Sequence, residues 1–226
     1  MQRIIGEIPA RLGSQRVKQK NLRPLNGVPL IGYAINAAKN ASCLTELYVN
    51  TESDEIGAVA QEYGAQFYKR REELSTDHAT SDEFNYDFIN GTRADVLVMI
   101  NPVSPLTEAS DIDDAVRYFT ENALDSLISV REEYFQALCR NEPVNFSLGE
   151  MLPRTQDLSP IQLCCWNICV WRASTFKDSF EKNGHAVFSG KVGFYTISKL
   201  KSIKISTEED FLMAEVLLKM RNSDIK

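Results

Sequence analysis

The feature that most constrains the fold is an irregular, positively charged loop between a short apolar segment and an amphipathic stretch. The apolar segment, residues 4–8, predicts a buried first strand, and the stretch after Pro29 has the three-and-four apolar spacing of a helix. The loop between them contains Gly13, Ser14 and five basic residues, which are Arg11, Arg16, Lys18, Lys20 and Arg23. A strand that opens into a cationic, glycine-containing loop is typical of phosphate-binding sites. Charge alone fits a solvated loop equally well, but the chain carries a net charge of −6, and this concentration of cations favours phosphate binding.

Strand and helix patterns alternate along most of the chain. Apolar runs predict strands at residues 47–49, 66–68, 96–100, 126–130, 164–171 and 194–197. Helical spacing predicts helices that begin near Pro29, Ser53, Thr80, Ser110 and Ser206. Such alternation predicts an α/β fold, in which a mostly parallel, Rossmann-like sheet has helices on both faces. Because parallel sheets bind ligands at the carboxyl ends of their strands, we expect the basic loop to lie at the functional edge.

The alternation fails between about Arg131 and Cys165, where prolines interrupt a mixture of aromatic and polar residues. We predict that residues 131–165 form a small antiparallel excursion from the sheet, which contributes part of the acid-sugar pocket and a subunit contact. Four of its side chains would expose more apolar surface to water than is usual for a protruding segment; they are Phe135, Leu138, Phe146 and Leu148. We find no repeats or linkers, so residues 1–226 are expected to form a single domain.

Composition argues against several classes of protein. The net charge of −6 argues against a general nucleic-acid binder. No apolar run approaches the roughly 20 residues of a membrane span, and the N-terminus lacks the apolar core of a signal peptide. The five cysteines suggest neither a disulfide framework nor a zinc site, and we expect Cys164, Cys165 and Cys169 to be buried strand residues. We therefore expect a cytoplasmic protein without a nucleic-acid or membrane partner.

The opening loop carries a resemblance to a known family. Its sequence IPARLGSQRVKQKN, followed by GVPLI, resembles the signature of the CMP-sialic acid synthetase (acylneuraminate cytidylyltransferase) family, in which this loop wraps the triphosphate of CTP. Gln15 and Lys18 depart from the usual Lys and Pro of that signature. The GxxxxGK[ST] pattern is absent, so a P-loop ATPase is not supported.

Three later stretches extend the resemblance over nearly the whole chain. NPVSPL at 101–106 is similar to the family's QPTSPL, and RTQDLSP at 154–160 is similar to its RxQDxPP run, which Asn167 follows. KISTEED at 204–210 aligns with the closing IDIDTxxD run, whose first residue falls on Ile203. The resemblance implies the nucleotidyltransferase version of the fold, a homodimer, and transfer of CMP from CTP to a sialic-acid-like 2-keto sugar acid.

The resemblance also implies roles for individual residues. Lys20 and Arg11 are the candidate catalytic residues, with Lys20 nearest the reacting phosphorus. The candidate nucleotide-binding residues are Arg11, Gly13, Ser14, Lys20, Asn21, Arg70, Ser81 and Asn101. The candidate residues for the acidic sugar are Ser104, Arg154, Gln156, Asp157 and Asn167. Ordinary alternatives stay open for three of these: Arg70 as a surface residue, and Gln156 and Asn167 as residues that satisfy backbone groups.

The main departure from the family falls on its metal site. The family holds Mg²⁺ largely through the two aspartates of the closing run, and here those positions are Lys204 and Ser206. A lysine cannot ligate Mg²⁺, and a serine is a weak substitute for a carboxylate. Ser206 also fits a capping box with Glu209. We expect Mg²⁺ to arrive with the nucleotide. Three alternatives stay open for the site: Lys204 takes the place of the metal, the enzyme uses another nucleotide or acceptor, or the protein binds nucleotide without catalysis.

Overall fold

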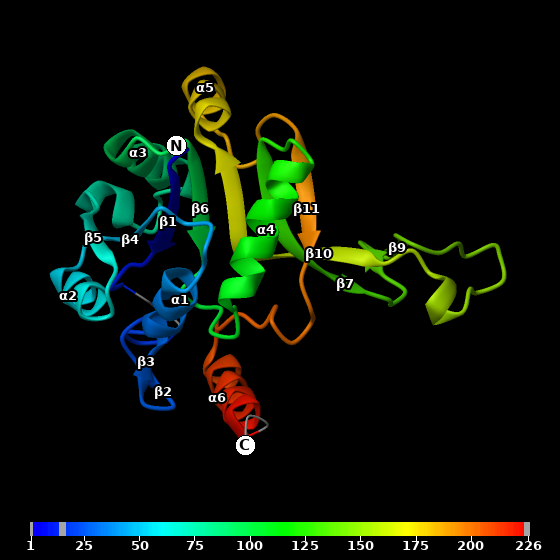
Figure 1. Cartoon of the computed structure of the whole chain (residues 1–226). Helices are drawn as coiled ribbons and strands as arrows, with labels where there is room; N and C mark the ends of the chain where they lie inside the picture. Colours follow the sequence, from blue (N-terminus) through cyan, green and yellow to red (C-terminus); the bar gives the residue numbers. More distant parts are fainter. Residues whose placement is uncertain (1, 14–16, 224–226) are drawn as a thin grey trace.

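The computed structural model describes residues 2–13 and 17–223, and a seven-stranded sheet lies at its centre (Figure 1). The strands follow the order β11-β7-β10-β6-β1-β4-β5. Their bounds are β1 Ile4–Pro9, β4 Glu46–Thr51, β5 Gln66–Lys69, β6 Val96–Ile100, β7 Ser126–Glu133, β10 Ile161–Arg172 and β11 Val192–Thr196. Strand β10 runs antiparallel to both of its neighbours, whereas every other adjacent pair is parallel. The prediction of a mostly parallel α/β sheet is confirmed.

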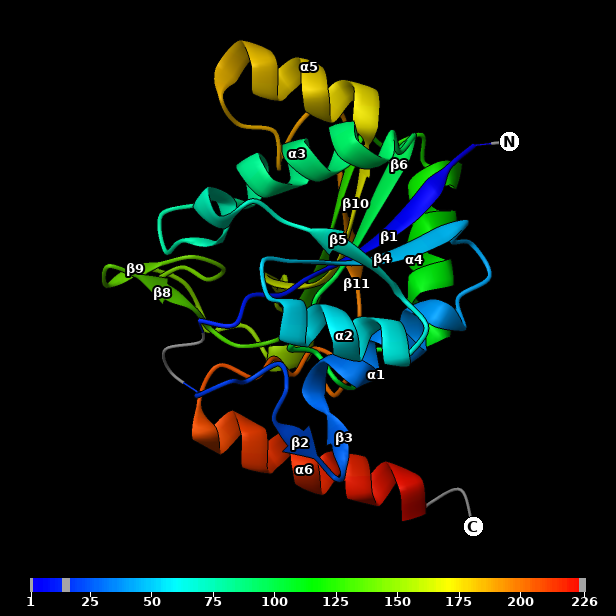
Figure 2. The same ribbon diagram turned by 90° about the vertical axis from the view of Figure 1, so that its left-hand side faces the viewer.

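Helices cover both faces of this sheet, as predicted. Their bounds are α1 Leu30–Lys39, α2 Asp54–Glu62, α3 Ser81–Thr92, α4 Ala109–Glu121, α5 Ala173–Asn183 and α6 Glu208–Ser223. Helices α1, α2 and α4 pack on one face, and α3 and α5 pack on the other (Figure 2). In the part of the chain that the structure describes, no helix is both long enough and apolar enough to span a membrane.

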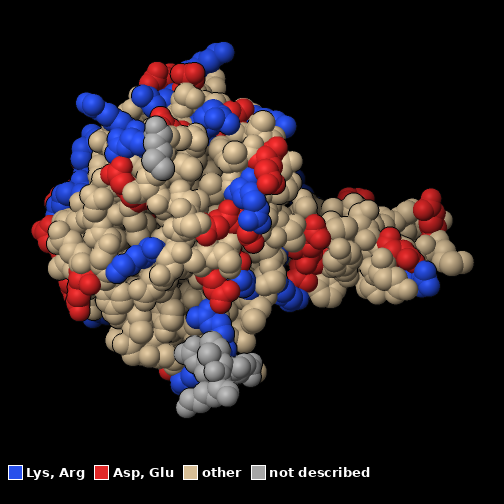
Figure 3. Space-filling view, viewed as in Figure 1, with Lys and Arg blue, Asp and Glu red and all other residues tan. Residues whose placement is uncertain are grey.

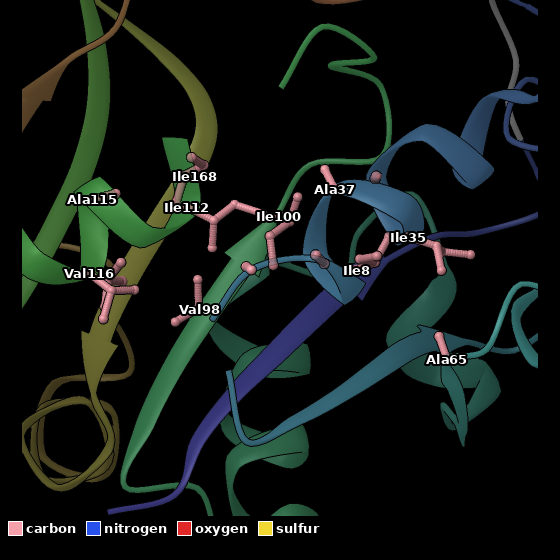
Figure 4. Close-up of a cluster of buried hydrophobic side chains, with 14 of the residues drawn as sticks. Ile8, Ile35, Ala37, Ala65, Val98, Ile100, Ile112, Ala115, Val116 and Ile168 are labelled. Carbon is pink, nitrogen blue, oxygen red and sulfur yellow. The ribbon is translucent and has the colours of Figure 1, made fainter. Parts of the chain in front are cut away.

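The largest core cluster lies between the sheet and helices α1, α2 and α4 (Figure 4). Val98 and Ile100 of β6 meet Ile35 of α1 and Ile112 of α4 there, and all four side chains are buried. Every residue of β6 is buried because the strand has neighbours on both sides and helices on both faces. Each such side chain contributes about 1.5–3 kcal/mol of hydrophobic stabilisation, which explains the continuous apolar run in the sequence.

A separate cluster of buried apolar side chains attaches α6 to the carboxyl edge of the sheet. Strands β2 (Pro24–Leu25) and β3 (Val28–Pro29) form a two-residue hairpin through Asn26 and Gly27, which both have positive φ. An Asn-Gly pair is the usual sequence for this turn. The Asn26 side-chain amide donates to the Glu215 carbonyl at 3.0 Å, and the hairpin lies beside α6 (Figure 2). Buried residues of the cluster include Leu25, Ile205, Phe211 and Leu218.

Residues 134–160 form an arm that stands clear of the body (Figures 1 and 3). Strands β7 and β10 continue beyond the sheet as an antiparallel pair, with Glu133 opposite Ile161. The arm then adds the short pair β8 (Leu138–Cys139) and β9 (Glu142–Pro143) and a 3₁₀ turn at Thr155–Asp157. The predicted antiparallel excursion is therefore confirmed.

Two predicted helix caps were wrong. Helix α4 begins at Ala109, with Glu108 rather than Ser110 at the cap position, and the Glu108 amide donates to Asp111 Oδ2 at 2.8 Å. At α6 the capping box lies one residue later than predicted. The hydroxyl of Thr207, rather than that of Ser206, accepts from the Asp210 amide at 3.2 Å.

Two further points differ from the sequence analysis. Helix α5 was not predicted. Cys164 is exposed, whereas Cys165 and Cys169 are buried as expected; the adjacent Cys164 and Cys165 differ because successive side chains of a strand point to opposite faces. All five cysteines are free thiols.

Candidate functional site

The candidate site is built from the loops that follow the parallel strands. The carboxyl ends of β1, β4, β5, β6, β7 and β11 lie at one edge, toward the bottom of Figure 1. The basic loop follows β1, residues 101–108 follow β6, and the closing segment, residues 202–210, comes after β11 and runs into the first turn of α6. The topology therefore brings together three of the four stretches that carry the family resemblance.

Two arginines line a small cavity at this edge. Arg11 pairs with Asp77 at 2.6 Å (Nη1 to Oδ1), and both lie with Arg70 around a cavity of about 130 Å³. Arg70 is only 4% exposed, and its guanidinium lies 4.5 Å from the centre of the Phe84 ring. The alternative that Arg70 is an ordinary surface residue is wrong, and its charge is held in place beside Arg11.

A buried carboxyl group positions Arg70. Glu7 Oε1 accepts a hydrogen bond from the side chain of Asn50, whose Oδ1 and main-chain carbonyl accept from Arg70 at 2.9 and 2.6 Å. Burial raises the pKa of Glu7 to about 7, although the Asn50 hydrogen bond and the charge of Arg70 oppose this shift. Glu7 was not among the predicted site residues, although a charged residue inside an apolar strand was a signal for it in the sequence.

Lys20 joins the opening loop to the closing segment. Its ammonium group donates to the Ile205 carbonyl at 3.0 Å, across 185 positions of sequence. Nearby, Arg23 pairs with Glu208 at 2.6 Å and lies 4.0 Å from the centre of the Phe211 ring. The candidate catalytic lysine therefore also has a structural role.

The other candidates of the basic loop differ in their surroundings. Asn21 is buried and donates to the Arg11 carbonyl at 3.2 Å, so it holds the loop in shape. A Cβ added at Gly13 would meet no described atom within 4 Å, so packing does not require a glycine there. Ser14 lies outside the described residues. Ser81 is exposed in the first turn of α3, next to the capping residue Thr80.

Asn101, which directly follows β6, lies next to Asn167 of β10. The main-chain N–H of Asn101 donates to the main-chain carbonyl of Asn167 at 2.9 Å. Asn167 is fully buried, and its side chain donates to the Lys201 carbonyl at 2.8 Å, which is the backbone-bonding role left open by the sequence. Ser104 is also buried, and neither its hydroxyl nor Asn167 Oδ1 has a hydrogen-bond partner among the described residues.

The remaining sugar-site candidates, Arg154, Gln156 and Asp157, lie on the arm. All three are exposed, and Arg154 pairs with Asp157 at 2.7 Å. No hydrogen bond or ion pair joins them to the basic loop within the described part of the chain. One copy of the chain therefore does not place these residues beside the candidate phosphate-binding arginines.

The closing segment does not fit a Mg²⁺ site. Lys204 is exposed, and Ser206 donates its amide to Asp210 Oδ2 at 2.8 Å. Burial opposes the ionisation of Asp210, but the amides of Ser206 and Thr207 and the charge of Lys20 lower its pKa on balance. Among residues 2–13 and 17–223, no three His, Cys, Asp or Glu side chains gather as metal ligands.

Residues 5–148 match the family described as cytidylyltransferase. The chain belongs to this family. It is 28% identical over its whole length to the post-translational flagellin modification protein B of Campylobacter coli, and covers 99% of that protein. It is 32% identical to N-acylneuraminate cytidylyltransferase A of Danio rerio over 92% of this chain, but spans about half (49%) of that relative. It is 28% identical to the CMP-N,N'-diacetyllegionaminic acid synthase of Campylobacter jejuni over 98% of this chain and 97% of that one.

Solved structures share the fold. The CMP:2-keto-3-deoxy-manno-octonic acid synthetase complexed with CTP has a TM-score of 0.72 at 15% identity, covering 97% of this chain and 99% of that one. The 4-diphosphocytidyl-2C-methyl-D-erythritol synthase of Anaerococcus prevotii has a TM-score of 0.70 at 12% identity, with 96% of each chain covered. The family match and the relatives confirm the resemblance to the acylneuraminate cytidylyltransferases that the sequence predicted. This cytidylyltransferase is therefore a nucleotidyltransferase enzyme.

Glu7 predicts a pH-dependent stability. Because its folded pKa of about 7 exceeds the ordinary 4.5, the stability that its protonated form contributes is complete below pH 4.5 and is lost as the pH rises through 7. We expect Glu7→Gln to gain about 3 kcal/mol in free energy of unfolding relative to wild type between pH 4.5 and 8. Urea titrations at several pH values measure this. The control Glu62→Gln, exposed on α2, should parallel wild type; a Glu7→Gln curve that also parallels it contradicts the assignment.

Proposed function

We propose that this cytidylyltransferase transfers CMP from CTP to a sialic-acid-like 2-keto sugar acid and releases pyrophosphate. The observation that carries the proposal is the convergence of Arg11, Lys20 and Arg70 at the carboxyl edge of the sheet. It is supported by relatives whose names specify N-acylneuraminate and a legionaminic acid, and by a neighbour in fold that was solved with CTP.

In the proposed reaction the protein supplies fixed positive charge and forms no covalent bond with either substrate. The anomeric hydroxyl of the sugar attacks the α-phosphorus of CTP and releases its proton to water. A new O–P bond forms, and the bond between the α-phosphorus and the oxygen that bridges to the β-phosphate breaks, so pyrophosphate leaves. Negative charge grows on the pyrophosphate, and fixed cations lower the barrier by stabilising it. In the proposed site Arg11 and Arg70 bind the phosphates, Lys20 lies nearest the reacting phosphorus, and Mg²⁺ arrives with the nucleotide.

The substrate assay tests this function directly. The protein is incubated with CTP, Mg²⁺ and a panel of 2-keto sugar acids, and pyrophosphate is measured; UTP and ATP in place of CTP test the base. We expect release with at least one acid and preference for CTP. A second candidate, a relative that binds nucleotide without this reaction, is favoured by Lys204 and Ser206 at the family's aspartate positions; binding of CTP without pyrophosphate release would support it.

We further propose a homodimer in which the arm of one copy completes the sugar site of the other. Within each copy, we propose that residues 1–226 form one domain. Two observations support the homodimer: the arm holds Arg154 and Gln156 away from the basic loop, and it exposes large apolar side chains. The most exposed are Phe135, Leu138 and Leu152 at 60% each, Leu148 at 76% and Met151 at 94%. Apolar side chains in such numbers on a projection are typical of an interface.

The dimer predicts a mass of two chains by light scattering at micromolar concentration. Leu148→Glu should shift the protein toward the monomer and lower sugar turnover, because a charge at an apolar interface is poorly solvated. Leu212→Glu is the matched control, since Leu212 is 59% exposed on α6, away from the arm. A monomeric wild type would exclude the dimer.

Lys20→Ala should abolish most turnover while the protein stays folded. Loss of a phosphate-binding cation should lower kcat/KM by roughly 30- to 1,000-fold, or about 2–4 kcal/mol. Loss of the hydrogen bond to Ile205 should reduce stability by about 1 kcal/mol. Lys18→Ala, which removes an exposed lysine from the same loop, should retain activity. If Lys20→Ala keeps wild-type kcat/KM, Lys20 has no catalytic role.

A further inference from the structure

A second cavity, of about 340 Å³, lies between the start of the arm and the closing segment. The end of β7 contributes Arg131, β10 contributes Leu163, the closing segment contributes Ser202, Lys204 and Asp210, and α6 contributes Met213. Two of these side chains are cationic and one is acidic, so the lining carries a net positive charge. The cavity is distinct from the smaller one between Arg11 and Arg70.

Arg131 is incompletely paired in this cavity. Its Nε is buried and has no hydrogen-bond partner among the described residues. This Nε does form an ion pair with Glu133 Oε1, but the distance is 3.4 Å, and the same oxygen lies 3.0 Å from the ammonium of Lys199. The other contact of the guanidinium is a long one, 3.5 Å from Nη1 to the Ser202 hydroxyl. A guanidinium has five donors in a fixed fork, so Arg131 can still bind an oxyanion.

Lys204 brings a second cation to the same space. It is exposed and forms no ion pair with any residue in the described ranges. The one acid of the lining, Asp210, already accepts two amides at 2.8 Å on Oδ2. The apolar side chains of Leu163 and Met213 form part of the wall, and the described lining residues add no second carboxylate to oppose an anion.

The closing segment connects this cavity with the basic loop. Lys204 of the segment lines the cavity, and Lys20 of the loop donates to the carbonyl of the next residue, Ile205. The segment has no carboxylate at the two positions where the family holds Mg²⁺, which are Lys204 and Ser206.

We propose that Arg131 and Lys204 form an oxyanion subsite beside the phosphate loop, which binds either the carboxylate of the acidic sugar or a phosphate of the nucleotide. Lys204 supplies there part of the positive charge that a protein-bound Mg²⁺ would supply. The assignment rests on the proposed function for the identity of the two anions. It does not rest on turnover, because binding alone reports on it.

Calorimetry in chelator tests the subsite with pairs of charged and neutral probes. CTP is compared with cytidine, and N-acetylneuraminate is compared with its methyl ester. Arg131→Gln and Lys204→Gln should each weaken one charged probe by about 10- to 100-fold and leave its neutral counterpart unchanged. The matched control is Lys182→Gln, an exposed lysine of α5 at the opposite end of the sheet (Figure 1), which should bind as wild type does.

Each outcome has a defined meaning. Weaker CTP binding assigns the subsite to phosphate, and weaker N-acetylneuraminate binding assigns it to carboxylate. The proposal is overturned if Lys204→Gln binds both anions as wild type does, or if wild type binds neither anion more tightly than its neutral counterpart. Arg131→Lys should restore part of the affinity lost in Arg131→Gln, which a folding defect would not do. Anion binding without pyrophosphate release would contradict the proposed function and leave the subsite standing.

The metal dependence gives an independent readout. Wild-type affinity for CTP should change little between Mg²⁺ and chelator, because the subsite supplies its own cation. The double variant Lys204→Asp and Ser206→Asp should require Mg²⁺ for the same affinity, since carboxylates are the ligands that Mg²⁺ prefers. Wild-type binding that vanishes in chelator and is unaffected by Lys204→Gln would overturn the role of this lysine.

Discussion

Parallel pairing of β6, β1, β4 and β5 is the constraint on which the rest of the molecule depends. A parallel pair requires the chain to cross back before the next strand begins, so strands paired in this way end at the same edge of the sheet. The loops that follow these strands therefore meet there. Because β10 is antiparallel to both of its neighbours, β7 and β11 run in the same direction as this group, so the segment after β11 reaches the same edge. Lys20 contacts Ile205 there although 185 positions separate them. The positive charge of the site comes from residues that no short stretch of sequence contains together.

The buried network of Glu7, Asn50 and Arg70 holds an arginine in place at this edge, and it does so at a cost in stability. A guanidinium that is 4% exposed needs a compensating charge, and Glu7 supplies it only through Asn50. Glu7 Oε2 has no hydrogen-bond partner in the described structure, which agrees with a pKa raised to about 7. Near neutral pH the network is thus partly protonated. Removing one partner from such a network costs more than the pair contributes, so the orientation of Arg70 is maintained at the expense of stability.

The sheet and the basic loop could be predicted because their signals are local. The apolar run of β6 and the cap at Ser53 both appear in the structure as expected. The α6 cap was misplaced because two overlapping patterns fit the same rule, Ser206 with Glu209 and Thr207 with Asp210. Helix α5 was missed because only Ala173 and Phe176 of its residues are buried. Contacts such as Arg11 with Asp77, and the separation of Arg154 from Asn167 by the arm, depend on the path of the chain in space, which no local pattern encodes.

The substitutions in the closing segment change the kind of charge at the site as well as its amount. In the family pattern two aspartates and Mg²⁺ sum to zero, whereas Lys204 and Ser206 together carry +1 without a metal. An ammonium group is a single cation with three donors, and it cannot order several oxygens in an octahedron as Mg²⁺ does. The proposed reaction therefore requires groups with rigid geometry to fix the direction of the leaving phosphates. Arg11 and Arg70 are our candidates for that role because guanidinium forks are planar, and the contacts with Asp77, Asn50 and Phe84 restrict their movement.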